Sequence, residues 1–191
     1  MIGRHAYMLL YSVARGELAL VKQVLENPEM ELHELSHELY KAICLAADNE
    51  SWDIVLYLLQ PEIVKQAKNL YNEYQQIFQR AVESGQLAVI NRLLEADCIA
   101  KGVNPAFNNN SAIAAAKLSA NLAVLERLLE VDCIALGVDP AADKNIDLMF
   151  MISHEYGLDL VKRLLQEVRV KDTLTNEQWL QVQKFLDHQS E

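Results

Sequence analysis

A ten-residue pattern recurs five times along this 191-residue chain at a nearly constant spacing. Its clearest copy, GQLAVINRLL, occupies residues 85–94, and the other copies lie at 16–25, 50–59, 120–129 and 156–165. The leucines that close the copies are separated by 34, 35, 35 and 36 residues. A period of this length indicates a repeat architecture, in which each unit buries its apolar face by stacking on its neighbours.

Apolar residues recur at fixed positions within each copy. In the clearest copy these residues are Leu87, Val89, Ile90 and Leu93. Their spacing forms one stripe of an amphipathic helix about ten residues long. Upstream lie a column of large apolar residues (Leu9, Ile43, Phe78, Ile113, Met149) and a mostly small one (Ser12, Ala46, Ala81, Ala116, Ile152). Each unit is therefore predicted to be a helical hairpin that turns at Gly16, Glu50, Gly85, Ala120 or Tyr156.

Five such hairpins predict an all-α fold, a solenoid of stacked antiparallel helix pairs in a single repeat domain over residues 1–191. The expected repeats are 7–26, 37–60, 71–95, 111–130 and 147–167. After them, residues 175–178 (TNEQ) have the sequence of a capping box. An apolar stripe follows at Trp179, Val182, Phe185 and Leu186. We therefore expect a helix over about 175–188 that caps the C-terminal end of the stack.

Residues 81–95 (AVESGQLAVINRLLE) resemble the second half of an ankyrin repeat, and the similarity extends over about 7–167. This resemblance to the ankyrin-repeat family implies stacked helix pairs that bind a partner protein on their concave face. The Thr-Pro-Leu-His signature of the family is absent from all five copies, and so is the Gly-rich connection that forms a projecting finger. The third and fourth repeats instead carry near copies of one segment, at 97–106 and 132–141.

Two further resemblances bear on the class of repeat and on the biological setting. A tetratricopeptide array has a similar period of about 34 residues, but its Trp, Gly, Tyr and Pro pattern does not occur here. Divergent, finger-poor ankyrin arrays resemble those of proteins that intracellular bacteria inject into host cells. That resemblance implies an effector that acts on a host protein, in the host cytosol.

Charge and cysteine content narrow the partners and the compartment. Seventeen basic and 27 acidic residues give a net charge of −10, which disfavours nucleic acid and anionic membranes as partners. No apolar run approaches the roughly 20 residues that span a bilayer. Cys44, Cys98 and Cys133 are odd in number, widely spaced and without a CxxC pair, which indicates neither a disulfide framework nor a thiolate zinc site and fits a reducing cytosol. We expect a cytoplasmic monomer that needs no cofactor, with Cys98 and Cys133 buried as small apolar residues.

One motif points to catalysis instead. His33, Glu34 and His37 form an HExxH sequence, in which two histidines one helical turn apart hold Zn²⁺ and the glutamate acts as general base. A third protein ligand is required, and the positions of the extended motif hold Tyr40 and Ile43. The zinc-dependent hydrolase is therefore the alternative hypothesis. The favoured interpretation is an acidic helix surface that carries two histidines.

Binding residues are expected on the exposed side of the first helix of each hairpin. Tyr and Arg are the residue types that most often carry binding energy. The candidate contacts are Tyr7, Tyr11, Lys41, Tyr74 and Arg80, all in the first three repeats. The alternative is that Tyr7 and Tyr11 only shield the open end of the stack.

Overall fold

The computed structural model describes residues 4–27, 36–66, 71–155 and 157–189. Every regular element within these residues is a helix, which confirms the predicted all-α class. The chain divides into two compact units, residues 1–81 with 88–103 and residues 82–87 with 104–191, here called unit 1 and unit 2. The prediction of one continuous repeat domain stays a prediction.

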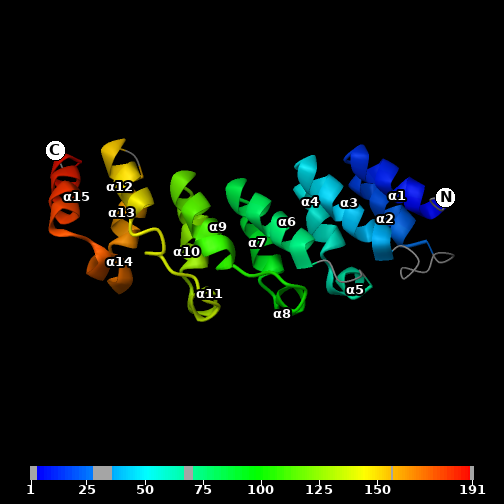
Figure 1. Ribbon diagram of the computed structural model, residues 1–191. Coiled ribbons are helices and arrows are strands. Elements are labelled where there is room, and N and C mark those ends of the chain that lie inside the picture. The colour runs from blue at the N-terminus through cyan, green and yellow to red at the C-terminus, as the bar shows by residue number, and fades with distance from the viewer. Residues whose placement is uncertain (1–3, 28–35, 67–70, 156, 190–191) are drawn as a thin grey trace. The chain divides into compact units, whose positions relative to one another are not determined.

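Unit 1 contains two complete helical hairpins that pack on each other. Its helices are α1 (Arg4–Ala14), α2 (Leu18–Leu25), α3 (Ser36–Asp48), α4 (Trp52–Leu58), α5 (Pro61–Val64), most of α6 (Tyr71–Glu83) and of α7 (Leu87–Leu93), and α8 (Ala96–Ile99). Helix α1 contacts α2 and α3, α3 contacts α4, and α2 contacts α4 (Figure 1). Equivalent helices of neighbouring hairpins therefore lie against each other within this unit.

Unit 2 repeats this arrangement. Its helices are α9 (Phe107–Leu118), α10 (Leu122–Leu128), α11 (Val131–Ala135), α12 (Ile146–Ser153), α13 (Leu158–Leu164), α14 (Val168–Thr173) and α15 (Asn176–His188). Helix α9 contacts α10 and α12, and α13 contacts α10 and α12. Helix α15 begins at the predicted capping box, in which Thr175 and Gln178 bond each other's backbone N–H groups, and it packs on α12.

The predicted turns share one backbone conformation. Gly16, Glu50, Gly85 and Ala120 all have positive φ, between 52° and 69°. In the first hairpin the Gly16 N–H donates to the Val13 carbonyl at 2.9 Å, and the Glu17 N–H donates to the Ser12 carbonyl at 3.1 Å. The second and fourth hairpins form the same pair of bonds. This is the Schellman motif, which ends a helix with a left-handed residue. The fifth predicted turn, Tyr156, lies outside the described residues.

A short third helix follows the second helix of the last four repeats, in the segments that come directly after the predicted repeats. These are α5, α8, α11 and α14, of four to six residues. The near-identical segments 97–106 and 132–141 fold alike. Arg92 binds both carboxylate oxygens of Asp97 at 2.8 and 2.6 Å, and Arg127 binds those of Asp132 at 3.0 and 2.8 Å. The arginine at the end of the hairpin thus fixes the short helix that follows.

The predicted apolar columns form most of the core, although Leu87 and Met149 are only partly buried. Leu58, Leu93, Leu128 and Leu164, one column of the second helices, are all buried. The second helices are seven or eight residues long, somewhat shorter than the expected ten. No helix in the described part of the chain is both long and apolar enough to cross a membrane.

Candidate functional site

Two predicted contact residues form a stacked aromatic pair on α1. Tyr7 is 61% exposed and Tyr11 45% exposed, and their ring centroids lie 6.2 Å apart with an interplanar angle of 18°. The two residues are one helical turn apart, so their side chains share one face of α1. Arg15, one turn further on, places its guanidinium carbon 5.8 Å from the Tyr11 ring centroid and also pairs with Glu17. We call Tyr7, Tyr11 and Arg15 the α1 aromatic surface.

The basic candidates lie on the following first helices of unit 1. Lys41 is half-buried on α3, whereas Arg80 is exposed near the end of α6. The Arg80 guanidinium forms an ion pair with Asp48 of α3, and both side chains stay about half exposed. Because its side chain is exposed, Arg80 remains accessible to a partner. Exposed pairs of this kind contribute little to stability.

The prediction that Tyr74 is a surface contact is wrong. Tyr74 is 1% exposed, and burial raises the pKa of its phenol. It lies eleven residues before its turn, at the position that the buried Leu39 occupies in the second repeat. Residue type suggested a contact, but the repeat position places the ring in the core. The Tyr74 hydroxyl has no hydrogen-bond partner among the described residues.

The HExxH motif begins before the first described residue of α3. His33 and Glu34 lie outside the described residues, and for His37 the structure describes only the backbone, within α3. The zinc interpretation of this motif therefore stays a prediction. Elsewhere, the described residues contain no group of three or more His, Cys, Asp or Glu side chains arranged to hold a metal ion.

The two repeated cysteines are buried, as the sequence predicts. Both Cys98 and Cys133 have no exposed surface. Burial raises the pKa of Cys98 to about 12 and that of Cys133 to about 11. A thiol with so high a pKa stays protonated at neutral pH and is a poor nucleophile or metal ligand. The two thiols therefore contribute to packing, as the buried residues of the short helices α8 and α11.

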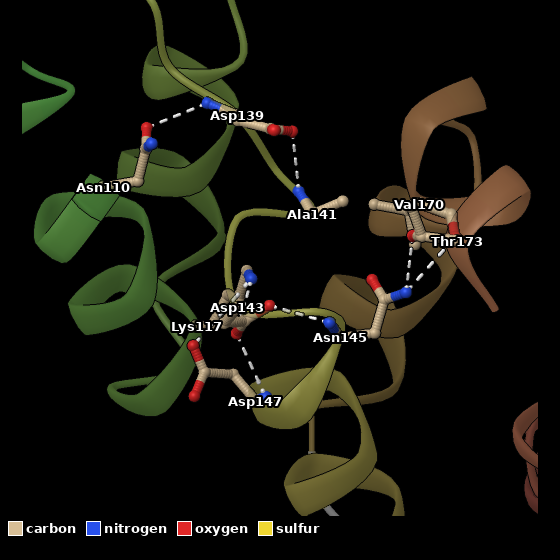
Figure 2. Close-up of polar contacts among 9 residues, drawn as sticks. All are labelled: Asn110, Lys117, Asp139, Ala141, Asp143, Asn145, Asp147, Val170 and Thr173. Atoms are coloured by element: carbon tan, nitrogen blue, oxygen red, sulfur yellow. Dashed lines mark hydrogen bonds and ion pairs between the residues drawn. The ribbon is translucent and has the colours of Figure 1, made fainter.

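Unit 2 contains a buried charge cluster that the sequence did not predict. Lys117 of α9 is 1% exposed, and its ammonium nitrogen lies 3.1 Å from Asp143 Oδ2 and 3.9 Å from Asp147 Oδ2 (Figure 2). Asp143 also accepts hydrogen bonds from the backbone N–H groups of Asn145 and Asp147, at 2.9 and 3.2 Å. The cluster therefore links α9 to the segment that leads into α12.

The two carboxylates of this cluster have opposite pKa shifts. Burial, a side-chain hydrogen bond to Asp143 and the charge of Asp143 together raise the pKa of Asp147 to about 7. Burial opposes ionisation of Asp143, but its hydrogen bonds and the charge of Lys117 hold its pKa below the ordinary value. Two carboxylates this close share one negative charge more easily than they carry two. Near neutral pH Asp143 is therefore ionised and Asp147 only partly so, and the cluster carries between one and two negative charges beside Lys117.

Amide side chains extend the cluster to neighbouring segments of unit 2. The buried Asn110 accepts a hydrogen bond from the Asp139 N–H at 2.8 Å. The buried Asn145 donates to Thr173 Oγ1 at 2.8 Å, at the end of α14 (Figure 2). These bonds join the start of α9 and the end of α14 to the segment before α12. Asn145 Oδ1 and Asp147 Oδ2 are buried without a hydrogen-bond partner among the described residues. The other polar groups of the cluster are satisfied chiefly by one another, which is consistent with a structural role.

A signal for this cluster was present in the sequence. Lys117 lies three residues before its turn, and the equivalent residues Val13, Ala47 and Val82 are all apolar and buried. A lysine in a column of buried residues requires an anionic partner. Asp143 and Asp147 supply it from 26 and 30 residues further along the chain.

In comparisons with protein-family models, with curated proteins and with solved structures, no significant match to this chain was found.

Proposed function

We propose that this chain is a protein–protein interaction module that binds its partner through the α1 aromatic surface and the basic residues Lys41 and Arg80. The stacked, exposed pair of Tyr7 and Tyr11 is the observation that carries this proposal. Such side chains supply a large and rigid contact area at a small cost in conformational entropy. Both rings lie outside the buried core.

The proposal includes an ankyrin-like stack of the five hairpins, with α15 as its C-terminal cap. Equivalent helices pack on each other within both units, and left-handed turns recur at the repeat period, which supports this architecture. A net charge of −10 favours a neutral or basic protein partner over nucleic acid. The setting that we propose is a cytosol, in line with the likeness to injected bacterial effectors.

The test begins with affinity capture from a cognate or host-cell lysate and identification of the partner by mass spectrometry. Titration calorimetry then compares wild type with Tyr7→Ala and Tyr11→Ala. We expect each change to weaken binding by about 1 kcal/mol or more, which is about fivefold. The matched control is Leu180→Ala, which removes an exposed apolar side chain from α15 and should leave the affinity unchanged.

A different distribution of effects would contradict this assignment. Lys22 on α2 and Lys162 on α13 are exposed residues of second helices. If both tyrosine variants bind like wild type while Lys22→Glu or Lys162→Glu abolishes binding, the contact surface lies on the second helices instead.

A further inference from the structure

A groove of about 400 Å³ lies between α1 and α2. Its walls are formed by these two helices and by Asn27, which follows α2. The apolar side chains that line it are Met8 from α1 and Leu20 and Val24 from α2. Met8 is 40% exposed, and Leu20 and Val24 are partly exposed.

The same positions are buried in the repeats that follow within unit 1. The equivalents of Met8, Leu20 and Val24 are Ala42, Ile54 and Leu58 in the second repeat, and Ile77, Val89 and Leu93 in the third. In the second repeat, α1 packs on α3 and α2 packs on α4. The hairpins repeat, so the groove on the first hairpin corresponds to one face of the second hairpin. On the second hairpin this face is covered by α1 and α2. A surface of this kind accepts helices.

The floor of the groove is apolar, like the same face of the repeats that follow within unit 1. Here Met8, Leu20 and Val24 keep the apolar character of the internal columns. Arg4 and His5 line one end of the groove, and His5 stands in the position of the buried Leu39. The other polar residues that line the groove are Ser12, Gln23 and Asn27. An apolar floor with a polar end is typical of a surface that binds and releases a partner.

The charge at one end of the groove is positive. Among the described residues, Arg4 is the charged residue that lines the groove, His5 lines it beside Arg4, and no acidic residue lines it. The chain as a whole carries a net charge of −10, so this positive lining contrasts with the overall charge. Complementarity of charge therefore favours an occupant that carries carboxylates at this end of the groove.

We propose that the groove binds an amphipathic helix of a partner protein, whose apolar side chains pack on Met8, Leu20 and Val24 and whose carboxylates pair with Arg4 and accept a hydrogen bond from His5. This inference rests on the proposed function, because it names the structural element of the partner that binds. It uses side chains other than Tyr7 and Tyr11, so the two can be tested separately.

The probes are three fluorescently labelled synthetic peptides of about five helical turns each. The first carries leucines at i, i+3, i+4 and i+7 spacing with glutamates on the opposite face. The second replaces every glutamate with lysine, and the third has the composition of the first in an order that forms no apolar stripe. Fluorescence anisotropy with the full chain should show the acidic amphipathic peptide binding at least fivefold more tightly than either of the other two.

Variants of the groove locate the binding. Met8→Glu places a carboxylate on the apolar floor and should weaken binding of the acidic peptide by tenfold or more. Arg4→Glu, at an exposed residue whose replacement leaves the core intact, should reverse the preference between the acidic and the basic peptide. The matched control Leu180→Glu, at an exposed leucine of α15, should bind like wild type.

Several outcomes would overturn the inference. These are equal binding of the three peptides, wild-type affinity of both groove variants, or binding to vesicles of anionic phospholipid in place of the peptide. If the peptides fail while Tyr11→Ala still weakens binding of the captured partner, the groove inference is wrong and the proposed function stands. If the acidic peptide binds while Tyr7→Ala and Tyr11→Ala have no effect on the partner, the groove is supported and the α1 aromatic surface is wrong.

Discussion

Replacing Lys117 with methionine removes the cation from the buried charge cluster and keeps most of the side-chain volume. Lys117 is 1% exposed, with Asp143 at 3.1 Å and Asp147 at 3.9 Å. Removal of one partner from a buried ion pair costs about 3–5 kcal/mol, because the remaining charge is neither solvated nor compensated. We expect a loss of this size in the free energy of unfolding at pH 8.

The loss should be smaller at pH 5. The pKa of Asp147 is raised to about 7, so at pH 5 this carboxyl is protonated and at pH 8 it is ionised. Lys117 lowers the pKa of both carboxyls, so its removal raises both. At pH 8 the variant must either hold two uncompensated carboxylates or take up a proton, and both cost free energy, whereas at pH 5 at most one carboxylate is left. The pH dependence therefore separates a charge effect from a simple packing defect.

The assay is urea unfolding followed by tryptophan fluorescence. The chain has two tryptophans, and in a Trp52→Phe background Trp179 of α15 reports on unit 2. The control is Lys162→Met, an exposed lysine of α13, which should change stability by no more than about 0.5 kcal/mol. A loss below about 1 kcal/mol for Lys117→Met at pH 8, or an equal loss at both pH values, would show that the cluster is not held as described.

Three further predictions concern turns, core and pH. Ala120→Gly should stabilise the protein by about 0.5–1 kcal/mol, because Ala120 has a φ of 52°, whereas Gly85→Ala should destabilise it, since an added Cβ would overlap a side chain of the next turn; thermal unfolding of both variants checks this. Leu93→Ala and Leu128→Ala, both fully buried, should each cost about 2–5 kcal/mol in urea unfolding. Because the pKa of Asp147 is raised to about 7, its protonated form contributes stability that is fully present below about pH 4 and is lost as the pH rises through about 7. Asp147→Asn stays neutral, so its stability should rise relative to wild type over this pH window.

The parts of the fold that depend on local sequence could be predicted. Apolar columns place the hairpin helices because a helix needs one apolar face to be buried. The turns at Gly16 and Gly85 are marked by glycine, whereas Glu50 and Ala120 were located by the repeat alone, and both are left-handed. The capping box at Thr175 follows from a four-residue pattern that is local by nature.

Features that depend on short segments or distant contacts could not be predicted in this way. Helices of four to six residues, such as α8, are too short to show a hydrophobic period. The pairing of Lys117 with Asp143 spans 26 residues, and only the folded chain brings them together. Tyr74 was misassigned because its residue type was given more weight than its position in the repeat.

Site-specific photocrosslinking tests the central claim, that α1 presents the binding surface, most directly. Benzoylphenylalanine is introduced in place of Tyr7 in one variant and in place of Leu180 in another, both at exposed positions. After irradiation in the lysate, the variant at position 7 should yield a crosslinked product that contains the captured partner, and the variant at position 180 should not. Crosslinking of that partner from position 180 but not from position 7 would contradict the account.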